Sequence, residues 1–353
     1  MSRVEASVLA VEALIRREEQ LFHPEQVRPS VVGKTVLITG AAGSIGSELC
    51  RQLLRLNPDC LLLLDHSEHG IYCLHQALQS LELETTLVPL IADVRDKARM
   101  TAICQAYQPD IICHVAAYKH VPLMESQPDE AVRNNIGGTL NLLEVATDQE
   151  IRSFVLVSTD KAVQPVGIMG ATKRVAELLV SAFRVQTGYP YLSVRFGNVL
   201  QSNGSVIPRF LAQIEAGGPV TITDRRMLRY FMTVREAAQL ILKALSFSDQ
   251  ADLFVSDMGT PVKIIDLAQA LIDQKAVGES IKIVETGIRP GERLEEVYLT
   301  ANEFVKEQIV EGLFIGQNIT LPLEELMDFI EQLTTSPPDQ LKKILLSFVN
   351  NYH

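Results

Sequence analysis

The chain has 353 residues, of which 47% are hydrophobic and 21% are charged, and its formal net charge is −11. Such a chain can bury a large core, and its negative charge argues against a general surface for nucleic acid or anionic membranes. No apolar run approaches the roughly 18 residues that a membrane helix needs. Glu5 and Glu12 interrupt the segment where a signal peptide requires an apolar core. We therefore expect a cytoplasmic protein that has no membrane span and does not bind nucleic acid.

Six short apolar runs alternate with longer helical patterns over the first 200 residues. The predicted strands cover residues 35–40, 60–65, 87–93, 110–117, 154–159 and 191–199. Near-continuous apolar strands separated by helices indicate a parallel sheet that is covered by helices on both faces. The sequence therefore predicts a doubly wound α/β fold.

Beyond about residue 200 the pattern becomes looser, because glycines and prolines interrupt it. The shorter strand candidates in this part are residues 219–224, 252–257 and 281–286. We assign these strands to a smaller second lobe. Further helices are expected ahead of the first strand, at residues 5–19, and from Leu321 onward.

A glycine-rich segment, TGAAGSIGS at residues 39–47, follows the first strand and opens a helical run. In this context Gly40 permits a tight turn, and Gly43 lets the backbone approach a diphosphate. Gly46 lets the helix pack closely on the strand. Amides at the helix N-terminus, around Ser44 and Ile45, would then donate to the anion. A glycine-rich turn that binds nothing is the plain alternative.

Acidic residues end the second and third predicted strands. Asp65 can accept hydrogen bonds from both hydroxyls of an adenosine ribose, whereas it would repel a 2′-phosphate. The sequence therefore favours NAD over NADP as the cofactor. Asp93 and Val94 are expected near the adenine, although an acid at this position also serves as a helix cap.

The segment STDKAVQPVGIMGATK, residues 158–173, ends the fifth strand and opens the next helix. A nicotinamide enzyme of this type places a tyrosine and a lysine four residues apart on one helix face, so that the ammonium lowers the pKa of the phenol. Here Lys173 is present, but Met169 stands at the tyrosine position. The plain alternatives for Met169 are a packing residue or a degraded active site. Candidates for the missing proton chemistry stand just upstream, at Thr159, Asp160 and Lys161.

These motifs form part of a longer ordered set. Together with AAYKHVPLMES, NNIGGT, RFGNV, GSVIPRF, RYFMTVREA and RPGERLEE, they resemble extended short-chain dehydrogenases/reductases of the nucleotide-sugar 4,6-dehydratase group, which serves bacterial polysaccharide biosynthesis. The resemblance runs from about Gly33 to Leu299. The MGATK form is similar to the branch that acts on UDP-N-acetylglucosamine with retention of configuration at C5. Many members of that branch have an N-terminal membrane region, and this chain resembles their catalytic part alone.

The resemblance implies a Rossmann-like fold with a smaller C-terminal substrate-binding lobe. We expect an N-terminal helical extension at residues 1–30 and an NAD-binding domain at 31–200. Residues 201–353 are expected to form mainly the nucleotide-sugar-binding lobe and the terminal helices, with the two lobes interleaved. Members of the family also commonly self-associate through helices, so we expect a homo-oligomer.

The implied reaction oxidises C4 of the hexose, removes the C5 proton and the C6 hydroxyl, and returns the hydride to C6, so NAD is not consumed. It needs a group at O4, a base at C5 and an acid for the departing hydroxyl. The resemblance assigns Thr159 to O4, Asp160 to the C6 oxygen and Lys161 to the C5 proton, and Lys173 to the nicotinamide ribose. An ordinary surface ion pair is the alternative for Asp160 and Lys161.

Further positions match cofactor and substrate contacts of the family. Ala116 is expected at the cofactor, and Asn135 is expected to hold the active-site helix in place. Arg229 and Arg289 match positions that hold the diphosphate, for which guanidinium groups are well suited, and Glu292 would bind the uridine ribose. The residues expected around the sugar and the closing nucleotide segment are Lys119, His120, Asn198, Ser205 and Val206. Solvated surface positions are the alternative for the charged members of this set.

Three functions remain open, and no metal is expected. A zinc site built from His66, His69, Cys73 and His75 is disfavoured, because no second ligand pair follows and the segment lies where the adenosine is expected. The leading function is a UDP-N-acetylglucosamine 4,6-dehydratase. The alternatives are a nucleotide-sugar epimerase and a non-catalytic NAD-binding regulatory subunit. The intact TDK segment and the missing tyrosine favour dehydration.

Overall fold

The computed structural model describes residues 24–81, 84–200, 202, 204–275, 280–297, 299, 308–310, 312–316 and 318–352. The helix expected at residues 5–19, and with it most of the expected N-terminal extension, lies outside the described residues. None of the helices within these ranges combines the length and the apolar character that a bilayer crossing requires.

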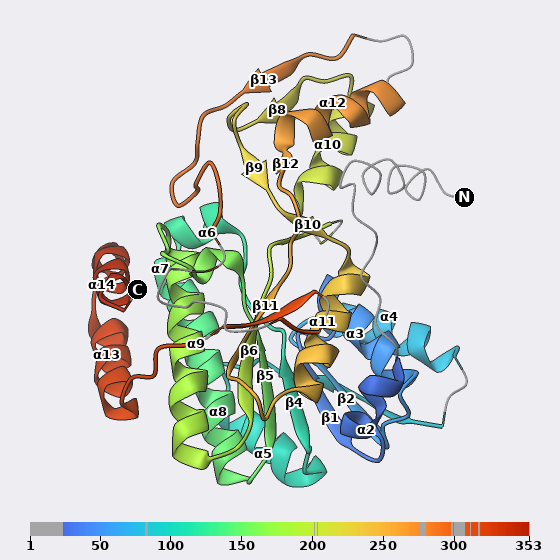
Figure 1. Ribbon diagram of the computed structural model, residues 1–353, viewed down its shortest axis with the longest axis vertical. Helices are drawn as coiled ribbons and strands as arrows, with labels where there is room; N and C mark the ends of the chain where they lie inside the picture. Colours follow the sequence, from blue (N-terminus) through green and yellow to red (C-terminus); the bar gives the residue numbers. More distant parts are fainter. Residues whose placement is uncertain are drawn as a thin grey trace.

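A sheet of nine strands, counted over the described residues, forms the centre of the larger lobe, in the order β14-β15-β11-β6-β5-β4-β1-β2-β3 (Figure 1). The parallel strands are β1 (Thr35–Thr39), β2 (Cys60–Asp65), β3 (Thr86–Ile91), β4 (Ile111–His114), β5 (Ser153–Val157), β6 (Tyr191–Arg195) and β11 (Leu253–Ser256). Two antiparallel strands, β15 (Leu313–Gly316) and β14 (Gln308–Val310), follow at one edge. The predicted doubly wound α/β fold is confirmed.

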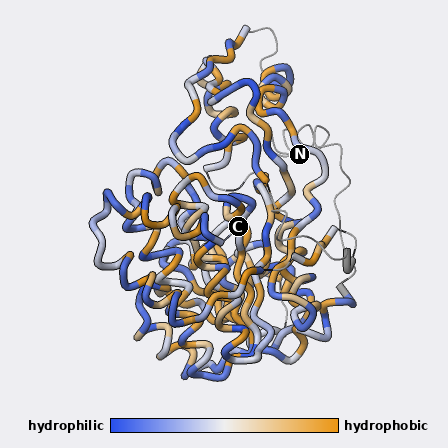
Figure 2. Tube along the Cα trace, turned by 60° about the vertical axis from the view of Figure 1, so that its left-hand side comes forward, coloured by the Kyte–Doolittle hydropathy of each residue, from blue (hydrophilic) through white to orange (hydrophobic). Residues whose placement is uncertain are grey.

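Helices cover both faces of this sheet, because its strands are apolar on both sides. Within β1, Val36 and Ile38 pack into one core cluster and Leu37 packs into the other. The helices of the first cluster are α3 (Ser44–Leu54), α4 (Glu68–Gln79) and α11 (Val234–Ser246). Those of the second are α5 (Lys97–Tyr107), α8 (Gly138–Asp148) and α9 (Ile168–Thr187). In Figure 2 the hydrophobic colour accordingly follows the central strands.

Two C-terminal helices, α13 (Leu323–Thr335) and α14 (Pro338–Asn350), pack against the outer side of α9 (Figure 1). Their apolar side chains, among them Phe329 and Leu345, belong to the same core cluster as α9. Helix α9 is therefore enclosed between the sheet layer and the C-terminal pair, and most of its residues are buried.

The smaller lobe is built mainly from segments that follow residue 200. Its helices are α10 (Val206–Glu215) and α12 (Ile264–Lys275), and its strand pairs are β8 (Val220–Ile222) with β13 (Ile283–Glu285) and β9 (Leu228–Arg229) with β12 (Val262–Lys263). A third core cluster, which includes Phe210 and Leu271, holds these elements together.

Two strand predictions need correction. The candidate at residues 252–257 was expected in the smaller lobe, but β11 lies in the large sheet beside β6, and all four of its residues are buried like those of the other central strands. The predicted strand at 191–199 is two strands. β6 ends at Arg195, and β7 (Asn198–Val199) pairs instead with β10 (Phe231–Met232). The expected boundary near residue 200 stays a prediction, and the large sheet and its helix layers take segments from both sides of it.

Candidate active site

A cavity of about 900 Å³ lies at the carboxyl ends of the parallel strands. Its lining includes residues that follow β1, β2, β3, β4, β5 and β6, and residues of the smaller lobe such as Val206, Arg229 and Ile264. In open α/β sheets this edge is where nucleotides and their substrates bind. The cavity also has the size of a small-molecule site.

The glycine-rich loop leaves its backbone open toward this cavity. Gly40 has a φ of +69°, and a Cβ there would lie 2.7 Å from the amide nitrogen of Ala116. A Cβ on Gly46 would lie 2.1 Å from the Gly40 carbonyl oxygen, so both positions require glycine. Helix α3 begins after Gly43 and has no side-chain cap, as in helices whose N-terminus binds an anion.

Most of the predicted cofactor residues line the cavity. They are Gly40, Gly43, Ser44, Ile45, Asp65, Asp93, Val94, Ala116 and Lys173. Gly46 is not among the lining residues and instead lies against the Gly40 carbonyl, beneath the loop.

The two acids that were predicted to lie near the adenosine make different contacts. Asp65 accepts hydrogen bonds from the amides of Ala42 (3.1 Å) and Ser67 (3.0 Å), which fix its carboxylate at the cavity wall. Asp93 instead pairs with Arg95, and the hydrogen bond from that guanidinium lowers the pKa of Asp93. The alternative role of Asp93 as a helix cap is wrong, because Asp96 caps α5.

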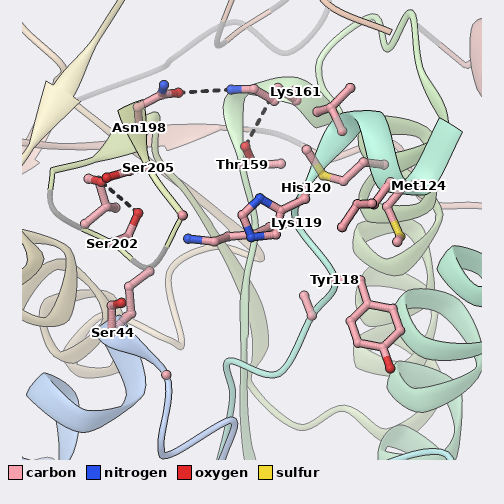
Figure 3. Close-up of a pocket in the computed structure, with 18 of the residues that line it drawn as sticks. Ser44, Tyr118, Lys119, His120, Met124, Thr159, Lys161, Asn198, Ser202 and Ser205 are labelled. Carbon is pink, nitrogen blue, oxygen red and sulfur yellow. Dashed lines mark hydrogen bonds between the residues drawn. The ribbon is translucent and has the colours of Figure 1, made fainter. Parts of the chain in front are cut away.

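Three consecutive residues after β5 form a hydrogen-bonded chain. Thr159 Oγ1 donates to Asp160 Oδ1 at 2.9 Å, and Lys161 Nζ donates to the same oxygen at 3.0 Å and to Asn198 Oδ1 at 3.1 Å. Thr159 and Lys161 line the cavity (Figure 3), whereas Asp160 lies behind them and is only 1% exposed. The alternative of a solvated surface ion pair is therefore wrong.

The Lys161 amine is surrounded by charge. Burial disfavours the ammonium and by itself would lower the pKa of Lys161. The nearby carboxylates of Asp160 and Glu296 outweigh this effect, so the pKa of Lys161 is raised. The distance from Nζ to Glu296 Oε1 is 3.6 Å. Lys161 is thus a cation in the ligand-free site, and it must lose a proton before it can act as a base.

Helix α9 brings Met169 and Lys173 to the cavity, one turn apart. Met169 is 5% exposed and also packs into the core cluster beneath α9. Burial lowers the pKa of Lys173 to about 8 despite the opposing charge of Glu177. Among the described residues the Lys173 amine has no hydrogen-bond partner, which leaves it free to donate to a ligand.

Asn135 connects the active-site helix to the neighbouring loop. It lies in η2 (Val132–Gly137), where its amide nitrogen donates to Thr172 Oγ1 at 3.1 Å and to the Tyr118 carbonyl at 3.0 Å. Its carbonyl oxygen accepts from the Tyr118 amide at 2.8 Å. These bonds fasten α9, close to Lys173, to the chain after β4.

Sequence reasoning missed a buried ionic network next to the Thr159–Lys161 segment. Glu177 accepts bidentate hydrogen bonds from Arg195 (2.7 and 2.6 Å), a bond from Arg174 (3.2 Å) and one from Ser158 Oγ (2.5 Å). The three charged side chains are fully buried. The network thereby fixes Ser158, the residue before Thr159. The three-residue spacing of Arg174 and Glu177 on α9 was the available signal, and it does not point to Arg195 or Ser158.

Lys119 and His120 extend from the chain after β4 into the cavity (Figure 3). Burial lowers the pKa of both side chains, and for His120 the neighbouring Lys119 adds to this effect. Gly204 has a φ of +70°, and a Cβ there would lie 2.5 Å from the His120 ring. The segment that leads into α10 therefore packs directly on His120.

The predicted diphosphate-binding arginines have protein partners. Arg229 donates to the carbonyls of Leu228 (2.6 Å), Arg293 (2.8 Å) and Leu294 (3.1 Å), so it holds the segment 289–297 in place at the cavity wall. Arg289 is more exposed and pairs with Glu292.

Unsatisfied polar atoms mark the same cavity. Ser205 Oγ and Glu292 Oε2 are buried at its wall and have no hydrogen-bond partner among the described residues, and the same holds for Asp160 Oδ2, which is buried next to the lining residues Thr159 and Lys161. Buried polar atoms are normally paired, so atoms of this kind fit a site that receives a polar ligand.

The histidine-rich segment after β2 lines the cavity beside Asp65, through His66 and His69. His69 Nε2 is 3.6 Å from Cys73 Sγ, and His66 Nδ1 is 3.4 Å from Asp65 Oδ1. Over the part of the chain that the structure describes, no three or more His, Cys, Asp or Glu side chains are grouped to hold a metal ion.

Known proteins with similar sequences share this architecture. A family model described as polysaccharide biosynthesis protein matches residues 36–318. The chain is 46% identical over 310 residues to the capsular polysaccharide biosynthesis protein CapD of Staphylococcus aureus, which covers 87% of this chain and 52% of that protein. It is 32% identical to a Campylobacter jejuni protein named UDP-N-acetylglucosamine 4,6-dehydratase (inverting), covering 77% of this chain and 79% of that one. The solved structure of Pen from Bacillus thuringiensis matches with a TM-score of 0.75 and 31% identity, covering 85% of this chain and 98% of that one.

The chain spans about half the length of CapD, so the match concerns that part of the relative. The matched residues 36–318 include the glycine-rich loop, the Thr159–Lys161 segment, α9 and the segment 289–297. Other relatives are named as UDP-glucose 4-epimerases, so the chain is related to both nucleotide-sugar dehydratases and epimerases. The resemblance expected from the motifs is confirmed, and the chain belongs to the polysaccharide biosynthesis protein family of extended short-chain dehydrogenases/reductases.

Proposed function

We propose that the protein catalyses the NAD-dependent 4,6-dehydration of UDP-N-acetylglucosamine to a UDP-4-keto-6-deoxy-sugar, with retention of configuration at C5, for the synthesis of a bacterial surface polysaccharide or glycan. The observation that carries this proposal is the hydrogen-bonded chain of Thr159, Asp160 and Lys161 at a cavity whose helix presents Met169 in place of a phenol. The dehydratase name of a 32% identical relative supports the same reaction class.

NAD fits the nucleotide end of the cavity. Gly40 and Gly46 leave no room for a side chain, α3 begins without a side-chain cap, and the Asp65 carboxylate lines the cavity, where it can also accept from ribose hydroxyls. When bound, NAD would accept the hydride from C4 of the sugar and supply it again at C6. Lys173 would donate to the nicotinamide ribose from the α9 side.

The proton of the sugar O4 has a path through two side chains. Thr159 Oγ1 can receive this proton while it passes its own proton to Asp160 Oδ1, 2.9 Å away. Asp160 then holds a proton, and because it lies behind the cavity wall, it returns this proton to Thr159 Oγ1 while the hydroxyl of Thr159 passes its own proton to the departing C6 hydroxyl. The proton that leaves O4 thus leaves the site in the water that is formed, and Asp160 ends as a carboxylate.

Lys161 handles the proton at C5. The 4-ketone acidifies that C–H bond, the neutral amine takes the proton, and the electron pair moves toward the carbonyl. Return of a proton from the same amine to the same face of C5 gives the retained configuration. This cycle leaves Lys161 unchanged, but it requires a neutral amine at the start, whereas the ligand-free site holds an ammonium.

Mass spectrometry of the product separates this function from the two alternatives. The purified protein is incubated with UDP-N-acetylglucosamine, and we expect a product lighter by one water. An isomer of unchanged mass would identify an epimerase, and no turnover in a protein that binds NAD would identify a regulatory subunit. Analysis by NMR of the product formed in heavy water then reports the configuration at C5. Homo-oligomerisation and a cytoplasmic location stay predictions.

A further inference from the structure

A buried histidine, His114, ends β4 and does not take part in the proton transfers described above. It is only 1% exposed, and burial lowers its pKa to about 3, an effect to which the charge of Lys173 adds. The ring is therefore neutral, so one of its nitrogens donates a hydrogen bond and the other accepts one. Because buried polar atoms are normally paired, both nitrogens need a matching partner.

Two threonine hydroxyls flank the ring. Nδ1 lies 2.8 Å from Oγ1 of Thr39, the last residue of β1, and Nε2 lies 3.0 Å from Oγ1 of Thr139, at the start of α8. Both threonines are fully buried. Thr139 Oγ1 also donates to the Asn135 carbonyl oxygen at 2.7 Å, and a carbonyl oxygen can only accept. The hydrogen of the Thr139 hydroxyl is therefore already in use.

These contacts favour one tautomer of the ring. With the proton on Nε2, the ring donates to Thr139, Thr139 donates to Asn135, and Thr39 donates to Nδ1, so all three short contacts are hydrogen bonds. With the proton on Nδ1, Thr139 would have to turn its hydrogen away from the Asn135 carbonyl and toward Nε2. The Thr39 hydroxyl would then lose Nδ1 as its acceptor, and a buried donor without an acceptor is costly. The Nε2–H form therefore makes one more hydrogen bond.

The ends of this hydrogen-bonded chain reach two different parts of the proposed NAD site. Thr39 opens the glycine-rich loop, and its Oγ1 also accepts from the amide of Ala116, a cavity residue, at 3.5 Å. At the other end, the Asn135 side chain donates to Thr172, the neighbour of Lys173 on α9. His114 thus lies between the loop expected at the diphosphate and the helix that carries Lys173.

The Asn135 side chain transmits any movement of its backbone to α9. Its Nδ2 donates to the Tyr118 carbonyl and to Thr172, and its Oδ1 accepts from the Tyr118 amide and from Asn134. A side chain with all of its donors and acceptors in use cannot turn without breaking a bond. A shift of the backbone at Asn135, whose carbonyl is bound to Thr139, should therefore move α9 as well.

We propose that His114, as the Nε2–H tautomer, is a positioning residue that joins the glycine-rich loop to the active-site helix and thereby fixes the spacing between the two parts of the NAD site. This inference rests on the NAD binding that belongs to the proposed function. No proton is transferred along the chain, and the ring acts only through its two hydrogen bonds. The competing interpretation is a ring that only fills space, in which case a phenyl group would serve equally well.

The first test observes the tautomer directly. NMR of ¹⁵N-histidine-labelled, NAD-free protein distinguishes a ring nitrogen that carries hydrogen from one that does not, and the signals of His114 are those that disappear in His114→Gln. We expect the proton on Nε2, and no titration over the pH range in which an unperturbed histidine titrates. A proton on Nδ1, or a ring that titrates in this range, overturns the inference.

The second test compares replacements of the ring by calorimetry of NAD binding, with circular dichroism as a check of the fold. Phenylalanine keeps the ring shape without hydrogen bonds, whereas glutamine can place an amide N–H near Thr139 and asparagine can place an amide oxygen near Thr39. We expect the affinity for NAD to fall on the order of tenfold in His114→Phe and by less in His114→Gln and His114→Asn. If His114→Phe binds NAD as tightly as the wild type, or more tightly than both amide variants, the ring only fills space and the inference is wrong.

A double-mutant cycle tests whether the groups act as one chain. Thr139→Val keeps the side-chain shape but removes the hydroxyl between His114 and Asn135, so we expect a loss of NAD affinity similar to that of His114→Phe. The double variant should bind no more weakly than the weaker single variant, because both changes break the same chain. The matched control is Thr101→Val in α5, where the hydroxyl makes the same kind of bond to the Lys97 carbonyl at a surface position, and it should bind like the wild type. Losses that multiply in the double variant contradict a single chain.

The failure of this inference and that of the proposed function can be told apart. If the wild-type protein binds NAD but the tautomer, the order of the ring variants or the cycle differs from expectation, only the role of His114 is wrong. The dehydration of the sugar is measured separately by the mass of the product. If the wild-type protein does not bind NAD, the proposed function is contradicted, and the inference falls with it.

Discussion

The two ends of the cavity are built in different ways. At the dinucleotide end, the backbone of Gly40–Gly46 and the amides of α3 define the site, and all of these groups lie in one continuous segment. At the sugar end, charged side chains from η3 (Asp160–Ala162), β9 and the segment 289–297 converge on Lys161. The first end depends on the absence of side chains, and the second depends on the charge that each side chain carries. Substitutions should therefore act on binding and packing at one end, and on proton transfer at the other.

The largest effect is expected from Asp160→Asn at the sugar end. Asparagine has the same shape but cannot hold the proton that Thr159 passes on, so turnover of UDP-N-acetylglucosamine should fall by about 10²–10⁴-fold. The exposed residue Asp249 provides the matched control, and Asp249→Asn should keep wild-type turnover. Mass spectrometry of the product measures both. Unchanged turnover in Asp160→Asn, with NAD still bound, would contradict the assigned role.

The stability of the protein should depend strongly on the charge of Glu177 in the buried network with Arg174 and Arg195. Glu177→Gln leaves Arg174 and Arg195 in a fully buried site without their carboxylate, and the cost of breaking a buried pair is about 3–5 kcal/mol. Urea denaturation gives the free energy of unfolding. The exposed change Glu331→Gln in α13 serves as the control and should leave this free energy nearly unchanged. If Glu177→Gln and Glu331→Gln had equal free energies of unfolding, the buried network of Glu177 would not stabilise the fold beside Thr159.

At the dinucleotide end, added volume should matter more than charge. Gly46→Ala places a methyl group 2.1 Å from the Gly40 carbonyl oxygen, so the loop must move, at about 1–3 kcal/mol for overpacking. NAD affinity, measured by calorimetry, should fall together with stability. Gly137→Ala is the control, because a Cβ there would lie 3.8 Å from the Val132 carbonyl oxygen, an ordinary van der Waals distance. Tight NAD binding by Gly46→Ala would mean that close helix packing is not needed.

The affinity for NAD should depend on pH through Lys173. Its pKa is lowered to about 8, so above this pH the ligand-free protein holds a neutral amine. If the ammonium donates to the ribose, binding must then take up a proton, and affinity should fall by up to about tenfold for each pH unit above 8. Lys173→Arg retains a permanent cation and should give a flatter profile. Identical pH profiles for the two proteins would exclude Lys173 as the cause.

The smallest effect is expected from Met169→Leu. Met169 is an apolar, buried residue with no proton to exchange, and leucine has a similar volume, so the cost in stability should stay below about 1.5 kcal/mol. Turnover should remain close to that of the wild type. A loss as large as that of Asp160→Asn would mean that the thioether takes part in the chemistry.

The same contrast explains what could be predicted from the sequence. The first five strands and the glycine-rich loop are local patterns of apolar and glycine residues, and each was found close to its observed position. The strand β11 was placed in the wrong lobe, because an apolar run does not specify which neighbour it pairs with. Glu177 and Glu296 were missed for a related reason. Their partners, such as Arg195 and Lys161, come from other segments, and only the fold brings their charges together.

The central claim is that one hydride leaves C4 of the sugar and reaches C6 while Thr159, Asp160 and Lys161 move the protons. UDP-N-acetylglucosamine with deuterium at C4 tests it most directly, with the product analysed by NMR and mass spectrometry. We predict a product that has lost one water and carries the deuterium at C6. A dehydrated product without that label, or a C4 epimer of unchanged mass, would contradict the account.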